Sequence, residues 1–336
     1  MDLIDFLIIP IFVCSWMGVF LYKKYAIFNG IISNPNYRTL HEVPIPSGGG
    51  VIFSLLFILS IFLIWLNQQL SNNLFFMLGV GGVTASLLGF KDDISNIKAS
   101  NKLIIQLILS SWVIFCLYLD NLLYLNWLPI FILIPVLLFV MVWFVNAYNF
   151  IDGVDGMAAS GAIFLSLTLA LVLFLTDKSV ELIPVFILIA ILVGGFISFN
   201  WPPASIFMGD AGSVFLGYTF GSLMLYTTLN GDITVWVWIT VFGYFFADTM
   251  VTQIVRVILV EKWYLPHRSH AYQNLARITA SHSKVTSGVV LYNILWVLPL
   301  TLLSVFRPEN EVIIAILANL PALIIAYKYG PLYSSS

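Results

Sequence analysis

Residues 146–156 read Asn-Ala-Tyr-Asn-Phe-Ile-Asp-Gly-Val-Asp-Gly, and they separate two long apolar runs, 127–145 and 158–175. The amides and carboxylates of this stretch recur at every third residue, at Asn146, Asn149, Asp152 and Asp155. Ionised side chains at the mouth of a membrane-spanning segment are costly and are functional candidates by default. An unbroken helix would spread them over about half of its circumference, but the glycines let the backbone bend. We therefore expect a helix end that curls around a cation or a phosphorylated ligand; the alternative is a polar loop whose aspartate caps the second helix.

The composition is that of a protein embedded in a membrane. Of the 336 residues, 60% are hydrophobic and 9% are charged, whereas charged residues make up about 25% of an ordinary soluble domain. Both cysteines, Cys14 and Cys116, lie inside apolar runs and indicate neither a disulfide framework nor a thiolate metal site. We predict an all-α, polytopic integral membrane protein in which residues 1–336 form a single transmembrane domain.

Eleven apolar segments approach or reach the length that a spanning helix needs. They cover residues 3–22, 50–66, 74–90, 103–119, 127–148, 157–176, 181–199, 212–229, 232–258, 285–306 and 311–329. With this assignment, twelve of the fourteen Lys and Arg residues fall on one side of the membrane. Because basic residues concentrate on the cytoplasmic side, we predict that the N-terminus lies outside and the C-terminus in the cytoplasm. The first run has its lysines at its end, so we interpret it as a retained helix and not as a cleavable signal peptide.

A second pair of carboxylates follows the third predicted span, in the sequence Lys91-Asp92-Asp93. Adjacent carboxylates repel each other unless a cation or a proton lies between them. Magnesium prefers carboxylate and phosphate oxygens. With Lys98 and Lys102 close behind, the pair is suited to a metal-bound phosphate, and the alternative is an ordinary solvated helix end.

Glycines mark two other predicted cytoplasmic connections. Asp210 stands between Gly209 and Gly212, just before the eighth predicted span. It can cap that helix, and a helix N-terminus also attracts an anion, whose bound cation an aspartate can hold. Residues 48–50 are all glycine and enter the second span. They predict either close helix packing or a close approach of the backbone to a ligand.

The last cytoplasmic connection is basic and carries His267, Arg268 and His270. Two histidines at this spacing can bind a metal, but zinc usually takes three or four protein ligands. The basic residues of this connection fit a polyanion better, with phospholipid headgroups as the alternative partner. In the ninth span, Asp248 and Arg256 share a helix face, where they form either a structural pair or a substrate contact.

The carboxylates, lysines and histidines of these connections all fall on the predicted cytoplasmic side. This inventory fits phosphoryl transfer at a membrane surface, in which Mg²⁺ neutralises the phosphates and a carboxylate acts as a base. A transporter is one alternative, but transporters usually show related halves, and no repeat is evident here. A CDP-alcohol phosphotransferase is another, because residues 152–156 partly match its motif. That motif continues with further aspartates, whereas no acid follows Ala158 before Asp177.

The whole pattern resembles the polyprenyl-phosphate N-acetylhexosamine-1-phosphate transferases of glycosyltransferase family 4. The resemblance covers nearly the whole chain and rests on residues 46–50, Asp92-Asp93 with Lys102, residues 146–156, residues 208–213 and residues 267–270. It implies transfer of a sugar 1-phosphate from a UDP-sugar to undecaprenyl phosphate, with release of UMP and a requirement for Mg²⁺, which Mn²⁺ can replace.

The resemblance also implies roles for individual residues. Asp210 and Asp93 are the expected metal ligands, and the expected catalytic carboxylates are Asp92, Asp93, Asp152 and Asp155. The expected substrate contacts are Lys102, Asn146, Asn149, His267, Arg268 and His270.

Two departures from the peptidoglycan translocase pattern affect the expected substrate. Residues 267–270 replace its triple histidine, and Asn96 stands where a lysine is expected. The closer resemblance is to the enzymes that initiate lipopolysaccharide O-chains, with Tyr272 and Gln273 helping to choose the sugar. We therefore expect a UDP-N-acetylated hexosamine and undecaprenyl phosphate as partners, no nucleic acid, and a location in the bacterial cytoplasmic (inner) membrane. A homodimer is an open alternative for the assembly.

Overall fold

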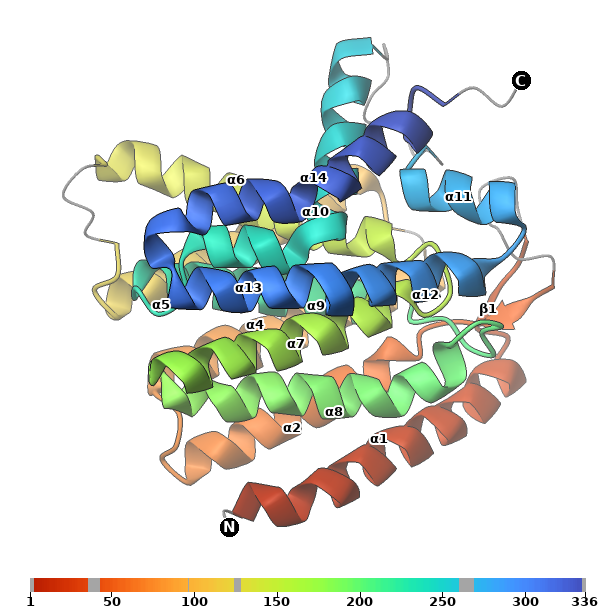
Figure 1. The fold of residues 1–336 in the computed structure, drawn as a ribbon. Helices are drawn as coiled ribbons and strands as arrows, with labels where there is room; N and C mark the ends of the chain where they lie inside the picture. The colour runs from red at the N-terminus through yellow and green to blue at the C-terminus, as the bar shows by residue number, and fades with distance from the viewer. Residues whose placement is uncertain (1–2, 36–42, 96, 124–127, 260–268, 334–336) are drawn as a thin grey trace.

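The computed structural model describes residues 3–35, 43–95, 97–123, 128–259 and 269–333. Its long helices run side by side as a bundle (Figure 1). The first half of the chain contributes α1 (Leu3–Phe28), β1 (Ile32–Ser33), β2 (Ile45–Pro46), α2 (Gly50–Leu66), α3 (Asn72–Phe75), η1 (Phe76–Val80), α4 (Gly81–Ser95), α5 (Ala99–Leu119) and α6 (Ile130–Ile151). The second half contributes α7 (Met157–Thr176), η2 (Val180–Leu182), α8 (Ile183–Asn200), α9 (Asp210–Leu229), α10 (Val235–Leu259), α11 (Ala271–Thr279), α12 (His282–Tyr292), η3 (Asn293–Val297), α13 (Leu298–Phe306), η4 (Pro308–Asn310) and α14 (Glu311–Tyr329).

The all-α, polytopic fold is confirmed, and each predicted span coincides with a helix. Among the described residues, nine helical segments are long and apolar enough to cross a membrane. They include the continuous segments Asn72–Ser95 and His282–Phe306, each assembled from several labelled pieces. The other two predicted spans are α2, which has only 17 residues, and α9, which is more polar. The chain is a multi-pass membrane protein, and the sidedness of its ends stays a prediction.

The outer surface of the bundle is apolar. Large side chains such as Phe131, Phe139 and Phe174 are at least 70% exposed, and Leu295 is 69% exposed. In water, so many exposed apolar groups would form an extensive hydrophobic surface. Helices satisfy their own backbone hydrogen bonds, so these faces can lie directly against lipid chains.

Helix α9 lies inside the bundle and is buried almost along its whole length. It packs against α4, α6 and α2, and glycines allow the closest approaches. A Cβ atom on Gly50 would lie 2.3 Å from the Cα of Gly212, and one on Gly89 would lie 2.1 Å from the carbonyl oxygen of Asp210. Of the two interpretations of the glycines at 48–50, close packing is therefore the one seen at Gly50. This packing brings the ends of α2 and α4 to the N-terminus of α9.

Backbone hydrogen bonds join the connections at this end. Strands β1 and β2 pair antiparallel, with Ile32 opposite Pro46, a small hairpin that we did not predict. The Phe207 N–H donates to the Pro46 carbonyl at 2.8 Å, and the Gly49 N–H donates to the Phe207 carbonyl at 2.9 Å. Figure 1 shows β1, α11 and the start of α12 at the same end of the bundle. Segments far apart in the sequence therefore meet there.

Candidate active site

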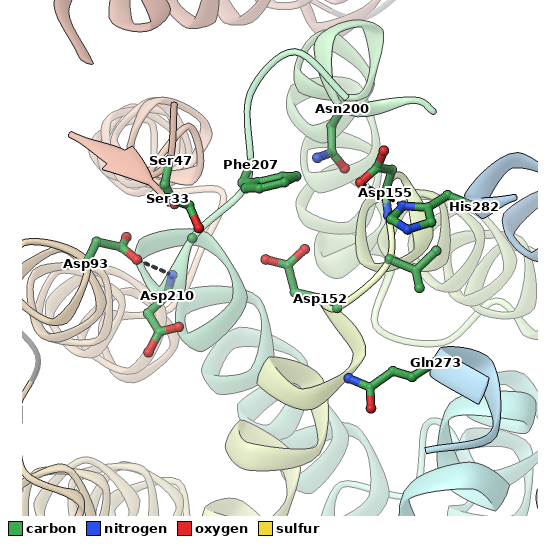
Figure 2. Close-up of a pocket in the computed structure, with 13 residues that line it drawn as sticks. Ser33, Ser47, Asp93, Asp152, Asp155, Asn200, Phe207, Asp210, Gln273 and His282 are labelled. Carbon is green, nitrogen blue, oxygen red and sulfur yellow. Dashed lines mark hydrogen bonds and ion pairs between the residues drawn. The ribbon is translucent and has the colours of Figure 1, made fainter. Parts of the chain in front are cut away.

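A cavity of about 300 Å³ opens at the end of the bundle where these connections meet. Its walls come from the β1–β2 hairpin, the end of α4, the α6–α7 and α8–α9 connections, and the starts of α9, α11 and α12 (Figure 2). The residues that line it are Ser33, Ser47, Asp93, Asp152, Gly153, Val154, Asp155, Asn200, Phe207, Gly209, Asp210, Gln273 and His282. Four of the predicted site carboxylates, Asp93, Asp152, Asp155 and Asp210, are thus brought to one cavity.

Asp93 is fixed against the N-terminus of α9. Its Oδ1 accepts the Asp210 N–H at 2.8 Å, and its Oδ2 accepts the Ala211 N–H at 3.1 Å. The partial positive charge of a helix N-terminus stabilises a carboxylate in this position. The preceding residue must be small, because a Cβ on Gly209, whose φ is +71°, would lie 2.5 Å from the Asp93 Oδ2. Asp93 therefore caps α9, and each of its oxygens keeps one further lone pair for a ligand.

Asp210 is held by donors from two neighbouring helices. The Lys102 ammonium donates to Asp210 Oδ2 at 3.1 Å and also forms an ion pair with Asp92. On the other side, the Asn149 amide donates to Asp210 Oδ1 at 2.9 Å and to the Ser213 hydroxyl at 2.9 Å. Lys102 and Asn149, both predicted as substrate contacts, thus contact the predicted metal ligand in this structure.

Asp92 lies beside Lys102, and it is not among the described residues that line the cavity. Its Oδ1 accepts the Ile97 N–H at 2.6 Å, and its Oδ2 is paired with Lys102. Both oxygens are therefore engaged by donors of the chain. This arrangement places Asp92 next to Asp210 and one side chain away from the cavity.

Asp152 follows directly after α6 and lies between the Asp93–Asp210 pair and the Asp155–His282 pair (Figure 2). Burial, together with the negative charges of Asp210, Asp93 and Asp155, raises the pKa of the Asp152 carboxyl well above its usual value. The ionised form of Asp152 is therefore disfavoured, first by its burial and then by the neighbouring carboxylates. A cation, or a proton, would relieve the repulsion among these carboxylates.

Asp155 is engaged by protein groups on all sides. Its Oδ2 accepts the Ala204 N–H at 3.0 Å, its Oδ1 lies 3.0 Å from the His282 Nδ1, and its carbonyl accepts the Thr286 hydroxyl at 2.7 Å. Close by, the Asn200 side chain accepts the Gly156 N–H at 3.0 Å. The turn after α6 is therefore tied both to the α8–α9 connection and to α12.

Two other predicted residues lie away from the cavity. Asn146 donates to the Gln106 side chain at 2.9 Å and to the Val142 carbonyl at 2.7 Å, so it joins α6 to α5. His270 is 2% exposed, and its Nδ1 lies 3.7 Å from Asp248 Oδ1. His267 and Arg268 lie outside the described residues.

Asp248 has a role that neither sequence interpretation anticipated. Its Oδ1 accepts the Ala271 N–H at 2.9 Å, so a residue of α10 caps α11 from another part of the chain. The Tyr272 hydroxyl donates to the Phe150 carbonyl, which docks α11 on the end of α6. A Cβ on Gly153 would lie 3.0 Å from the Gln273 amide nitrogen. Through these contacts α11 places Gln273 in the cavity wall.

Sequence reasoning missed His282, Asn200, Phe207 and the two serines of the hairpin as cavity residues. The chain has only four histidines, and His282 shares no regular spacing with the others. Its one local signal is Ser281, whose hydroxyl accepts the Lys284 N–H at 3.2 Å and so marks the start of α12.

The oxygen-rich walls of the cavity fit a hard divalent cation. Among the residues that the structure describes, no three His, Cys, Asp or Glu side chains converge as a closed metal site. Magnesium does not require such a site, because it usually takes one or two carboxylates and fills its other positions with substrate phosphates and water. Asp210, with Asp93 beside it, is suited to that role.

Comparison with known protein families matches residues 75–228 to Glycosyl transferase family 4. This range contains Asp92, Asp93, the stretch 146–156 and Asp210. The part of the chain that carries these motifs is thus similar to glycosyl transferase family 4. The family match ends before α10, so α11 and α12, which carry Gln273 and His282, lie beyond it.

Individual relatives match a larger part of the chain than the family model does. A Bacillus subtilis protein named as a probable undecaprenyl-phosphate N-acetylglucosaminyl 1-phosphate transferase is 28% identical over 80% of this chain and 76% of its own length. Phospho-N-acetylmuramoyl-pentapeptide-transferases of Lactobacillus gasseri and Thermodesulfovibrio yellowstonii are 32% and 31% identical. Those two matches span 51% and 61% of this chain, and 58% and 65% of the relatives. With such bacterial relatives and its apolar helices, the chain is a multi-pass protein of the bacterial inner membrane.

Proposed function

We propose that this protein transfers an N-acetylhexosamine 1-phosphate from a UDP-sugar to undecaprenyl phosphate, releasing UMP and leaving an undecaprenyl-diphosphate-sugar. The observation that carries this proposal is the convergence of Asp93, Asp152 and Asp210 on one cavity at the end of an apolar helix bundle. A donor with a diphosphate needs compensating cations, and an acceptor with a long lipid chain needs a bilayer beside the site. The match of residues 75–228 to family 4 and the similarity to the Bacillus subtilis protein support the same reaction.

We propose Mg²⁺ as the cofactor, with Mn²⁺ able to replace it, held by Asp210 and Asp93. When bound, it would neutralise the diphosphate and stabilise the charge that develops on the departing UMP. The carboxylate oxygens that line the cavity are the hard donors that a divalent cation of this kind prefers.

The side chains around that position then have distinct tasks. Lys102 holds the Asp92 and Asp210 carboxylates together, and Asn149 fixes the other oxygen of Asp210. Asp93 ties the start of α9 to α4. These contacts hold the acidic groups in place before the substrates arrive, and such preorganisation is a main source of catalytic stabilisation in charged sites.

Two routes remain open for the carboxylates. In direct transfer, the phosphate oxygen of undecaprenyl phosphate attacks the sugar-bearing phosphorus, and a carboxylate takes up any proton on the attacking phosphate. In the covalent route, a carboxylate attacks that phosphorus first and expels UMP, and undecaprenyl phosphate then takes the phosphosugar from the carboxylate, which is regenerated. Asp152 faces the cavity and Asp92 does not, so Asp152 is the better placed of the two for contact with substrate. Trapping of a radiolabelled phosphosugar on wild-type protein, and its loss in Asp152→Asn, would establish the covalent route.

We propose an N-acetylated hexosamine such as GlcNAc as the sugar, and initiation of O-antigen or another cell-surface polysaccharide as the pathway role. Residues 267–270 lack the triple histidine expected for a muramoyl-pentapeptide donor. The relative that this chain covers most fully among those above is also named for N-acetylglucosamine.

The proposal is tested by the nucleotide that the protein releases. Purified protein in liposomes with undecaprenyl phosphate and Mg²⁺ is given a panel of UDP-N-acetylhexosamines, and a separate sample receives a CDP-alcohol donor. UMP release that depends on undecaprenyl phosphate is expected. Release of CMP would support the CDP-alcohol alternative, and no release from any donor would leave the transporter alternative.

A further inference from the structure

On the C-terminal side of the family-matched region, α11 and α12 contribute to the wall of the cavity through Gln273 and His282. Helix α12 begins at His282, directly after its capping residue Ser281. The His282 side chain is 20% exposed and lines the cavity, and that of Asp155 is 12% exposed. Figure 2 shows the two side chains next to each other, on the side of the cavity away from Asp93 and Asp210. The start of α12 is thus part of the site and not only a membrane anchor.

The imidazole of His282 contacts Asp155 through its Nδ1 atom. The Nδ1 atom lies 3.0 Å from Asp155 Oδ1 and 3.4 Å from the Asp155 backbone nitrogen. A bare Nδ1 accepts the Asp155 backbone N–H. A carboxylate oxygen only accepts, so the contact with Oδ1 is an ion pair when Nδ1 carries a proton. In either protonation state, Nδ1 is the atom through which the imidazole contacts Asp155.

Asp155 transmits this contact to the rest of the site. Its second oxygen accepts the Ala204 N–H, and its carbonyl accepts the Thr286 hydroxyl, so three segments of the chain meet at one residue. Asp152, whose carboxylate faces the cavity, lies three residues earlier in the same turn. Loss of the imidazole would remove the contact between Asp155 Oδ1 and α12, and the Thr286 hydroxyl would be left to hold the turn on α12.

We propose that His282 is a positioning residue of the donor site, which acts through Nδ1 and Asp155 to hold the 152–155 turn in its binding conformation. The proposal rests on the proposed function, because the donor is taken to be the UDP-sugar. It assigns a role in donor binding to the start of α12, which the match to family 4 does not reach.

Three substitutions separate action through Nδ1 from action through Nε2. The amide nitrogen of His282→Asn falls near the position of Nδ1, that of His282→Gln falls near Nε2, and His282→Ala has neither. A hydrogen bond to a charged group contributes about 1.5–3 kcal/mol, which corresponds to about tenfold or more in affinity. We expect His282→Ala and His282→Gln to raise KM for UDP-GlcNAc by about tenfold or more, and His282→Asn by less than about threefold.

The KM for undecaprenyl phosphate is expected to stay unchanged in all three variants. Ser283→Ala is the matched control, because Ser283 is the next residue of α12 and is exposed. A merely structural role would lower the amount of folded protein or kcat without ranking the variants in this way. Rescue by Gln instead of Asn would overturn the proposal in favour of a direct Nε2 contact, and wild-type KM in His282→Ala would refute it outright.

A binding measurement makes the test independent of turnover. Titration calorimetry with UDP should show the same ranking of Kd values, and His282→Ala should add little to the loss already caused by Asp155→Ala. Additive losses would mean that His282 does not act through Asp155. If wild-type protein binds UDP but converts no UDP-sugar, the proposed function fails and the Kd ranking still decides the role of His282. If it neither binds nor reacts, both are overturned.

Discussion

Replacement of Gly89 by alanine is the change that most directly tests how the bundle positions Asp210. Gly89 lies in α4 against the first residue of α9, and an added Cβ would lie 2.1 Å from the Asp210 carbonyl oxygen and 2.6 Å from the Ala211 nitrogen. Ordinary van der Waals contact begins at 3.4 Å. The two helices must therefore separate by roughly 1.3 Å along this contact, since close-packed interiors have no space to absorb a methyl group.

The magnitude follows from two opposing effects. Overpacking costs about 1–3 kcal/mol, and the upper end applies here because the clashing atoms are backbone. Alanine regains about 1 kcal/mol of helix propensity over glycine. The expected net destabilisation is thus about 2 kcal/mol. Activity is more sensitive, because a displacement of about 1 Å can cost about a hundredfold in rate, and Asp93 is bonded to the same end of α9.

The assay is thermal unfolding in detergent together with UMP release in liposomes. Gly82→Ala is the matched control, since Gly82 lies on the same helix and its added Cβ would meet only side chains, the Phe215 ring at 3.2 Å and Ile58 at 3.9 Å. This control is expected to retain activity and stability. Wild-type activity in Gly89→Ala would refute the packing argument, and equal losses in both variants would show that α4 tolerates no alanine for some other reason.

Three further predictions concern charge. The pKa of Asp152 is raised in the folded protein, so the metal-free protein should lose the stability linked to Asp152 as pH rises from about 4 through that raised pKa. Thermal melts measured against pH should lose this dependence in Asp152→Asn. The same pH profile in wild-type protein and in Asp152→Asn would contradict the shift. Reporter fusions after Lys178 and after Lys284 should lie on opposite sides of the membrane, and a shared side would end the predicted topology. Arg268→Ala should lower kcat/KM for the UDP-sugar at least about tenfold, or about 1.4 kcal/mol; a small loss that varies with lipid charge would indicate headgroup contact instead.

The helices could be predicted because the bilayer imposes a simple rule on the sequence. A helix that spans the bilayer needs a long apolar run with polar residues at its ends. Every segment predicted from this rule coincides with a helix. The central position of α9 could not be read in the same way. Its serines, threonines and glycines lower its apolar character, and only the neighbouring helices reveal that this polarity is buried.

Cavity residues could be predicted where a carboxylate stands at the end of an apolar run beside a glycine or a second carboxylate, as at Asp93, Asp152 and Asp210. Asn146 shares the three-residue spacing of that motif but stands one turn too early on α6, so its amide meets Gln106 of α5. His282 and Gln273 enter the site only because Asp248 and Asp155 draw α11 and α12 towards it. Such long-range contacts leave no periodic signal in the chain.

The fate of the donor's β-phosphate tests the central claim most directly. Wild-type protein and Asp210→Asn are incubated with undecaprenyl phosphate, Mg²⁺ and UDP-GlcNAc that carries a radiolabel in the β-phosphate. Transfer of a sugar 1-phosphate predicts that the label moves to the lipid while unlabelled UMP is released, and that Asp210→Asn inserts normally but transfers no label. Label that stays in the nucleotide as UDP, or full transfer by Asp210→Asn, would contradict it.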